Sequence, residues 1–206
     1  RLKGDEVEQE KGVLAEDLVG ACHGPNFRVV VGVKGGMAFF ADDTWQKVDG
    51  LATTSLRDVV CDATGAWAVG AGGTVVHLVI KDGKATPDVT VLNGKPDLWA
   101  VARTGKTVWA AGDGQAGVGP TLMRADDGKW ETGWPAGFNP KDIPNLRRLI
   151  SIGGGTVLAG DEKGGMWRVS PAGVGDESPE RRDIRAVGGL RLKDGRTVVV
   201  GEPGLW

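Results

Sequence analysis

The strongest constraint on the fold is a hairpin-like motif that recurs along the chain. Its clearest copy, AWAVGAGGTVVHL at 66–78, runs from an apolar segment through a glycine and a Gly-Gly pair into a second apolar segment. Weaker copies lie at 29–40, 108–125, 156–169 and 197–206. The glycines that end the first segment are Gly32, Gly70, Gly112, Gly160 and Gly201, separated by 38, 42, 48 and 41 residues. A repeat of this length predicts a fold built from similar supersecondary units.

Each repeat contains further short segments that predict strands. An apolar segment precedes every hairpin, in DLVGAC (17–22), SLRDVVC (55–61), DLWAVAR (97–103), NLRRLIS (145–151) and DIRAVGG (183–189). A polar turn and a fourth segment follow several hairpins, as in ADDTWQKV (41–48) and ADDGKWETGW (125–134). Val, Ile and Trp are frequent in these segments, and turn-forming residues bound them. Four short antiparallel strands in about 40 residues are typical of a β-propeller blade.

We therefore predict one all-β domain, a β-propeller over residues 1–206. The repeat units cover about 13–50, 51–93, 94–140, 141–180, and 181–206 together with 1–12. The first twelve residues align with the last strand of a blade, and the final residues align with the third strand of another. The simplest interpretation is five four-stranded blades, the last closed by both termini, which removes free sheet edges. The alternative is a fragment of a larger propeller.

The motifs also resemble known propeller repeats. The stretch LRDVVCDATGAWAVGAGGTVVHL is similar to the repeat of propellers related to the photosystem II assembly factor, and ADDTW and ADDGKW resemble degenerate Asp-boxes of the BNR class. Asp-boxes recur in sialidases, but those enzymes use a tyrosine nucleophile and this chain has no tyrosine. We expect a non-catalytic interaction or scaffold module. The alternative is a glycan-binding lectin or a glycosidase-like propeller enzyme.

The first strand of each unit carries the main candidate site, because this strand lines the central channel of a propeller. The residues that follow its opening Leu or Ile include Arg57, Trp99, Arg147 and Arg185, and Arg148 adds a further guanidinium. Arginine suits carboxylates and phosphates, and tryptophan adds a flat stacking surface. The pattern predicts a channel mouth that binds a protein, an acidic peptide or another anionic ligand. The alternative is that the arginines pair with local acids such as Asp58 and Asp97 and hold adjacent blades together.

A second candidate surface lies in the loop GWPAGFNPKDIPN, at 133–145. Its three prolines make it stiff, and Trp134 and Phe138 give it an aromatic character. Loops on a rigid scaffold commonly carry binding residues. We expect either an exposed aromatic surface that contacts a partner or a loop that packs back on its own blade.

Composition argues against several other functions. The net charge of −2 and the pI of about 5.8 do not predict nucleic-acid binding, and no apolar run is long enough for a membrane helix. The Gly-rich turn at Gly70 precedes a strand rather than a helix, so it does not predict a phosphate site. We expect no metal and no cofactor. An exported location, periplasmic or extracellular, is favoured over a cytoplasmic one.

The remaining candidates have structural interpretations. Adjacent acids in the turns, Asp42 with Asp43 and Asp126 with Asp127, supply too few oxygens for calcium and are expected to cap their own turns, while the nearby Trp packs between sheets. Cys22 and Cys61 occupy matching positions of neighbouring units. We expect buried free thiols, with a disulfide as the alternative.

Overall fold

The computed structural model describes residues 2–3, 6–7, 12–51, 54–115, 117–178, 185–192, 194–202 and 204–205. The described chain is all-β apart from a short 3-10 turn, η1 (Ala71–Gly73). Blade 1 consists of β3 (Leu18–His23), β4 (Arg28–Gly32), β5 (Met37–Ala41) and β6 (Thr44–Lys47). Blade 2 consists of β7 (Leu56–Cys61), β8 (Gly65–Gly70), β9 (Thr74–Lys81) and β10 (Lys84–Val91).

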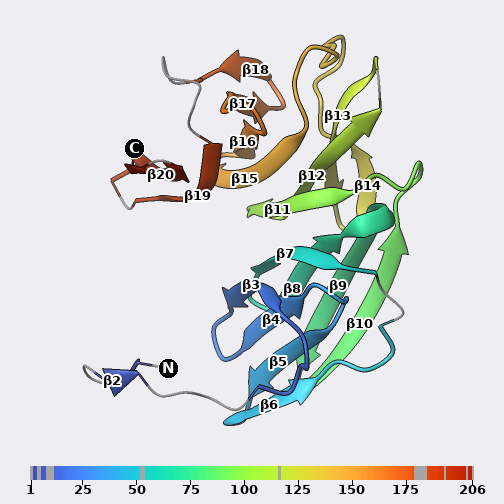
Figure 1. The fold of residues 1–206 in the computed structure, drawn as a ribbon, viewed down its shortest axis with the longest axis vertical. Coiled ribbons are helices and arrows are strands. Elements are labelled where there is room, and N and C mark those ends of the chain that lie inside the picture. Colours follow the sequence, from blue (N-terminus) through green and yellow to red (C-terminus); the bar gives the residue numbers. More distant parts are fainter. Residues whose placement is uncertain are drawn as a thin grey trace.

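The next sheets repeat this pattern. Blade 3 consists of β11 (Leu98–Thr104), β12 (Thr107–Gln115), β13 (Gly119–Asp126) and β14 (Lys129–Thr132). Blade 4 consists of β15 (Leu146–Gly153), β16 (Thr156–Asp161), β17 (Met166–Ser170) and β18 (Gly173–Asp176). Figure 1 shows the blades following one another in an arc, and the first strands β3, β7, β11 and β15 contact one another in turn along its inner side. The fold is an all-β propeller with four four-stranded antiparallel blades.

The prediction of a fifth four-stranded blade completed by the N-terminal residues is wrong. The last sheet has three strands, β19 (Arg185–Arg191), β20 (Thr197–Glu202) and β21 (Gly204–Leu205). The N-terminal strands β1 (Leu2–Lys3) and β2 (Glu6–Val7) pair with each other, not with β21. A local hairpin closes a much shorter loop than pairing between the two ends of the chain, so it loses less conformational entropy.

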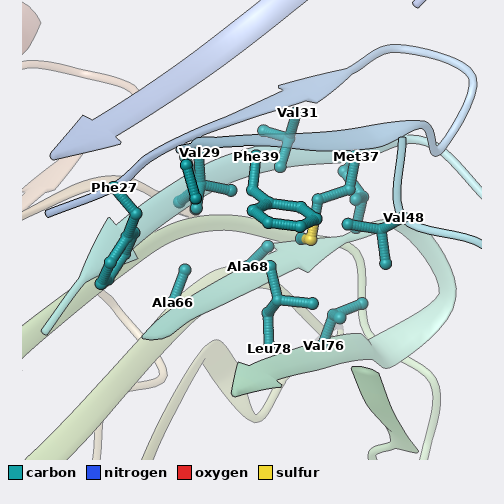
Figure 2. Close-up of a cluster of buried hydrophobic side chains, with 13 residues drawn as sticks. Phe27, Val29, Val31, Met37, Phe39, Val48, Ala66, Ala68, Val76 and Leu78 are labelled. Carbon is teal, nitrogen blue, oxygen red and sulfur yellow. The ribbon is translucent and has the colours of Figure 1, made fainter. Parts of the chain in front are cut away.

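The hydrophobic core lies between the blades. Figure 2 shows the cluster between blades 1 and 2, where Val29, Met37 and Phe39 of blade 1 face Ala68 and Leu78 of blade 2. Similar clusters fill the spaces between blades 2 and 3, between blades 3 and 4, and between blade 4 and the last sheet. Each blade therefore buries its apolar residues against its neighbours, and single blades have no core of their own.

The leucine that opens each inner strand shows this dependence clearly. Leu56, Leu98 and Leu146 are fully buried, with 0% of their surface exposed, whereas Leu18 in blade 1 is 55% exposed. At the other end of the arc, Val187 of the last sheet is also exposed. The difference follows from position in the arc, because blade 1 and the last sheet are its two end sheets (Figure 1).

A β-bulge recurs at the start of the inner strands. The register shifts just after the opening leucine of β3, β7, β11 and β15, so the extra residues are Val19, Arg57, Trp99 and Arg147. Bulges re-aim side chains. In the last sheet the shift falls two residues later, at Val187, and Arg185 pairs directly with Glu202. The expected equivalence of Arg185 with Arg57 and Arg147 is therefore wrong for the backbone, and the Arg185 side chain lies outside the described residues.

Glycine at the end of the second strand is required by close packing. A Cβ atom on Gly70 or Gly112 would collide with the carbonyl oxygen of Ser55 or Asp97. In blade 4 this position, opposite the opening Leu146, holds Asp161 and not the expected Gly160. The Gly-Gly pair of the opening motif forms the turn as predicted, because Gly72 and Gly73 have φ values of 63° and 74°.

The inner strands of blades 1 and 2 are joined by a disulfide. Cys22 in β3 and Cys61 in β7 are bonded, with their Cα atoms 5.4 Å apart. The expectation of free thiols is wrong, because matching positions on neighbouring inner strands lie within the range that a disulfide spans.

The paired acids serve tight hairpins mainly through their backbone conformation. Asp42 and Asp43 have φ values of 49° and 59°, which suits the two-residue turn between β5 and β6. Asp126 does not cap its own turn but accepts a 2.6 Å hydrogen bond from the Thr107 hydroxyl. As predicted, Trp130 packs between blades, with its ring 6.2 Å from that of Trp67.

Candidate functional site

Three bulge residues from consecutive blades meet on one face of the arc. The guanidinium carbon of Arg57 in blade 2 lies 3.7 Å from the ring centroid of Trp99 in blade 3. The guanidinium carbon of Arg147 in blade 4 lies 4.8 Å from the same centroid. Both distances are within the range of cation–π attraction. The structure thus brings together Arg57, Trp99 and Arg147, which we call the Arg–Trp–Arg cluster.

The arginines of this cluster are paired with acids from neighbouring blades. Arg57 donates a 2.8 Å hydrogen bond to Asp97, whose other oxygen accepts the Gly72 backbone N–H at 2.9 Å. These two hydrogen bonds, that from Gly72 first, hold the pKa of Asp97 below its usual value. Arg57 in blade 2 is therefore tied to the residue that opens blade 3.

Arg147 has two acidic partners. It donates to Asp113 and, at 2.6 Å, to Glu162, and Asp113 also accepts a 3.2 Å hydrogen bond from the Trp99 indole N–H. Asp113 and Glu162 were missed in the sequence. Both directly follow the position that closes the second strand, Gly112 and Asp161, so aligning the turn residues of the repeats would have revealed them.

Asp58 and Arg148 also connect neighbouring sheets, through hydrogen bonds to the backbone. The Asp58 carboxylate accepts hydrogen bonds from the backbone N–H groups of Val59 and Val101, both at 2.9 Å, and so connects blades 2 and 3. Burial raises the pKa of Asp58, and these bonds and the charge of Arg148 offset the rise only in part. Arg148 donates to the carbonyl of Val187 at 2.9 Å, which connects blade 4 to the last sheet.

A cleft of about 750 Å³ extends from the Arg–Trp–Arg cluster to the aromatic loop. Asp97 and Asp113, the acids that hold the two arginines, form part of its lining. The opposite part of the lining comes from the loop that follows β14, including Trp134 and Phe138. The cleft therefore connects the acids that pair with the cluster to the aromatic loop, while Arg57, Trp99 and Arg147 themselves are not part of its lining.

The aromatic loop packs back on its own blade and on blade 4. The rings of Trp134 and Phe138 stack with centroids 5.4 Å apart, and the Trp134 indole N–H donates to the Pro120 carbonyl at 3.1 Å. Both side chains are partly buried against the cluster that contains Trp109 and Ile143. The loop thus packs back on its blade and forms a wall of the cleft, while Trp134 and Phe138 remain partly exposed.

The described residues contain no group of three or more His, Cys, Asp and Glu side chains that could hold a metal ion. Within the same described parts, no helix is long and apolar enough to cross a membrane.

Comparison with known proteins identifies the fold. No protein-family model and no curated protein matches the chain. YCF48, solved with a bound D1 peptide, has a TM-score of 0.65 at 16% identity, over 94% of this chain and 64% of that one. The designed protein Ika4 gives a TM-score of 0.61 at 16% identity, over 82% of this chain and 99% of Ika4.

A third structure extends the likeness to a much longer chain. The extracellular domain of BT4673 from B. thetaiotaomicron matches with a TM-score of 0.65 at 16% identity, over 96% of this chain and 27% of that one. This chain therefore spans 64% of the length of YCF48 and about a quarter of the BT4673 domain. At these identities the likeness shows that the chain adopts the β-propeller fold.

Proposed function

We propose that this propeller is a non-catalytic interaction module that binds an extended peptide segment of a partner protein in the cleft beside the Arg–Trp–Arg cluster. The observation that carries the proposal is the cleft itself, which runs from Asp97 and Asp113, the acids that pair with the cluster, to the stacked pair Trp134 and Phe138. Its volume of about 750 Å³ suits several side chains of a peptide. The peptide-bound state of YCF48, a propeller of similar fold, supports this class of partner.

The arrangement of charges indicates which kind of peptide fits. Arg57 and Arg147 already pair with Asp97, Asp113 and Glu162, so a strongly acidic peptide would have to compete with three carboxylates. The Nη1 atom of Arg57, which has no hydrogen-bond partner among the described residues, is itself buried away from solvent. The arginines hold blades together, and the main attraction comes from the aromatic wall. We therefore expect an apolar anchor residue in the peptide, with acidic residues in a secondary role.

The rigid aromatic wall predicts a hot spot for binding. A large apolar side chain that stacks on Trp134 and Phe138 gains contact area without ordering a loop, because the loop is already fixed by the Pro120 hydrogen bond. Aromatic residues in such settings lose about 2 kcal/mol or more of binding free energy on truncation, which is about thirtyfold in Kd.

Selection of peptides from a random phage-displayed library tests this proposal. Peptides enriched on the wild-type chain should share an apolar anchor and should bind the Phe138→Ala variant at least about tenfold more weakly. Trp45→Ala, on the outer strand of blade 1 and away from the cleft, is the control and should bind like wild type. Melting temperatures show that both variants fold. Peptides that bind Phe138→Ala as tightly as wild type would contradict the proposal, as would selected acidic peptides whose binding depends on Arg147.

The cellular location is part of the same proposal. An exported module fits the disulfide between Cys22 and Cys61, because such bonds persist in oxidising compartments. The match to an extracellular domain supports the same assignment.

A further inference from the structure

A second cavity lies between blades 2 and 3, at the end of the strands opposite to the peptide cleft. It has a volume of about 470 Å³. Cross-strand pairing places Trp67, His77 and Asp88 in one row across blade 2. The facing row across blade 3 consists of Arg103, Val108, Ala125 and Trp130. All seven residues line the cavity, and none of them belongs to the Arg–Trp–Arg cluster or to the peptide cleft.

The same position is filled between the other blades. Between blades 1 and 2 the space holds Phe39, which is only 3% exposed. Between blades 3 and 4 it holds Trp109, the counterpart of Trp67, and Val169, the counterpart of Ala125. The change from Val169 to Ala125 removes two methyl groups from the middle of the row, while Trp130 takes the place of Val174 at its outer end. The cavity between blades 2 and 3 is therefore a local departure from the repeat.

The outer rim of this cavity is also different. In blade 3, Arg124 and Glu131 form a 2.7 Å ion pair across β13 and β14. The matching pair in blade 2 is His77 and Asp88, and His77 stacks on the Trp67 ring with centroids 3.9 Å apart and an interplanar angle of 6°. Burial lowers the pKa of His77, which favours the neutral imidazole. The Trp67 and His77 rings therefore form a flat aromatic wall beside the Asp88 carboxylate, at the place where blade 3 has a salt bridge.

A buried donor on blade 3 lacks a partner. The Nε atom of Arg103 is shielded from solvent and makes no hydrogen bond within the described residues. The nearest carboxylate oxygen, on Asp62, is 3.6 Å away, which is too long for a hydrogen bond. Asp62 is itself fixed, because it accepts hydrogen bonds from Thr64 and Gly65. The Nε atom is therefore closed to a ligand, but the Arg103 side chain as a whole is 32% exposed and lines the cavity, so a ligand can reach the rest of it.

These features indicate the chemistry of the ligand. The lining carries three acids, Asp62, Asp88 and Asp127, and two bases, Arg103 and Lys106, so its charges nearly balance. A strongly charged ligand would meet as much repulsion as attraction. A hydroxyl group accepts and donates at once, and can therefore accept from Arg103 while it donates to Asp62. One face of Trp67 is covered by His77 and its ring also meets Trp130 edge to face, but both tryptophans remain partly exposed and offer that surface to the C–H side of a pyranose ring.

We propose that the cavity between blades 2 and 3 is a binding site for an uncharged saccharide, formed by Trp67 and Trp130 with Arg103 and Asp62 as the hydroxyl-binding pair. The size of the cavity corresponds to one or two sugar rings. The site is independent of the peptide cleft and does not rest on the proposed peptide function.

A glycan array of neutral oligosaccharides, probed with the full chain, tests this proposal. We expect binding to a defined subset of the array, with a dissociation constant in the millimolar range or tighter, measured by titration with the free sugar that binds best. Trp130→Ala and Arg103→Gln should each weaken binding at least about tenfold. Trp45→Ala is the matched control, because Trp45 occupies the same position of β6 that Trp130 occupies of β14. It should bind like wild type.

Two further variants keep the result interpretable. Phe138→Ala, in the peptide cleft, should leave sugar binding unchanged, so failure of one proposal does not imply failure of the other. Ala125→Val adds two methyl groups to the wall of the cavity and should weaken binding, and the melting temperature shows whether the variant still folds. A blank array with wild-type protein would overturn the proposal. Equal binding by wild type and Trp130→Ala would also overturn it, as would preferential binding of charged glycans or peptides to this cavity.

Discussion

The opening leucine of the inner strand gives a direct measure of how much stability comes from burial between blades. Leu56 is fully buried between blades 1 and 2, whereas Leu18 is 55% exposed at the same repeat position. Leu→Ala removes three carbon atoms, and burial contributes about 0.8 kcal/mol for each. The residual cavity raises the total for Leu56→Ala to about 3–4 kcal/mol. Leu18→Ala loses less than half of the transfer free energy and leaves no closed cavity, so we expect about 1 kcal/mol.

Urea unfolding followed by tryptophan fluorescence measures both free energies of unfolding. Equal m-values for wild type and the two variants would confirm that the comparison concerns stability and not a change in cooperativity. A loss for Leu18→Ala as large as that for Leu56→Ala would show that the inner side of blade 1 is covered in solution, and would refute the open arc as the state that unfolds. Losses below about 1 kcal/mol for both variants would refute the view that burial between blades dominates stability.

Three further predictions concern single features of the fold. Replacing Cys22 and Cys61 with serine should lower the free energy of unfolding by about 4 kcal/mol, because the two cysteines are 39 residues apart in the sequence. Reductant should lower the stability of the wild type but not that of the serine variant. No loss on replacement would mean that the bond contributes nothing. Because the folded protein binds a proton at Asp58 more tightly than the unfolded chain does, the contribution of Asp58 is complete below about pH 4 and is lost as pH rises through its folded pKa. The stability of Asp58→Asn should therefore rise relative to that of the wild type as pH rises. The stability of Asp97→Asn should fall relative to the wild type over the same change, because the pKa of Asp97 is lowered. Free energies of unfolding measured at several pH values test both trends. Gly70→Ala should lower the melting temperature strongly, whereas Gly12→Ala, where a Cβ meets nothing within 4 Å, should leave it nearly unchanged.

The strands of the propeller could be predicted because their signals are local. The segments expected at 55–61 and 97–103 correspond to β7 (Leu56–Cys61) and β11 (Leu98–Thr104), whose apolar residues and flanking turn formers are visible in a short window. The closure of the last blade could not be predicted in this way. The N-terminal residues can pair with the last blade or with each other, and they form the local β1–β2 hairpin. An alignment of the repeats does not distinguish between these two pairings.

The candidate site was predictable in its location but only in part in its chemistry. Equivalent repeat positions correctly brought Arg57, Trp99 and Arg147 together, because inner strands of neighbouring blades touch. Their acidic partners Asp113 and Glu162 directly follow Gly112 and Asp161, and in blade 4 an alignment by the glycine motif is shifted by one residue, because Asp161 and not Gly160 pairs with the opening leucine. The cavity between blades 2 and 3 had no signal in a single repeat, since it depends on how each blade differs from its counterparts, as Ala125 differs from Val169.

The two sites differ in how the propeller makes room for a ligand. At the Arg–Trp–Arg cluster, the bulges bring charged side chains to the boundary between blades, and acids from the adjoining turns neutralise them. Such residues connect neighbouring blades, so we expect variation at the cluster to change the shape of the proposed peptide cleft. Between blades 2 and 3 the register is regular, and only side-chain volume decides whether the space is filled. A repeat protein can therefore acquire a pocket by one substitution such as alanine for valine without moving its backbone, provided that the neighbouring interfaces keep the blades in place.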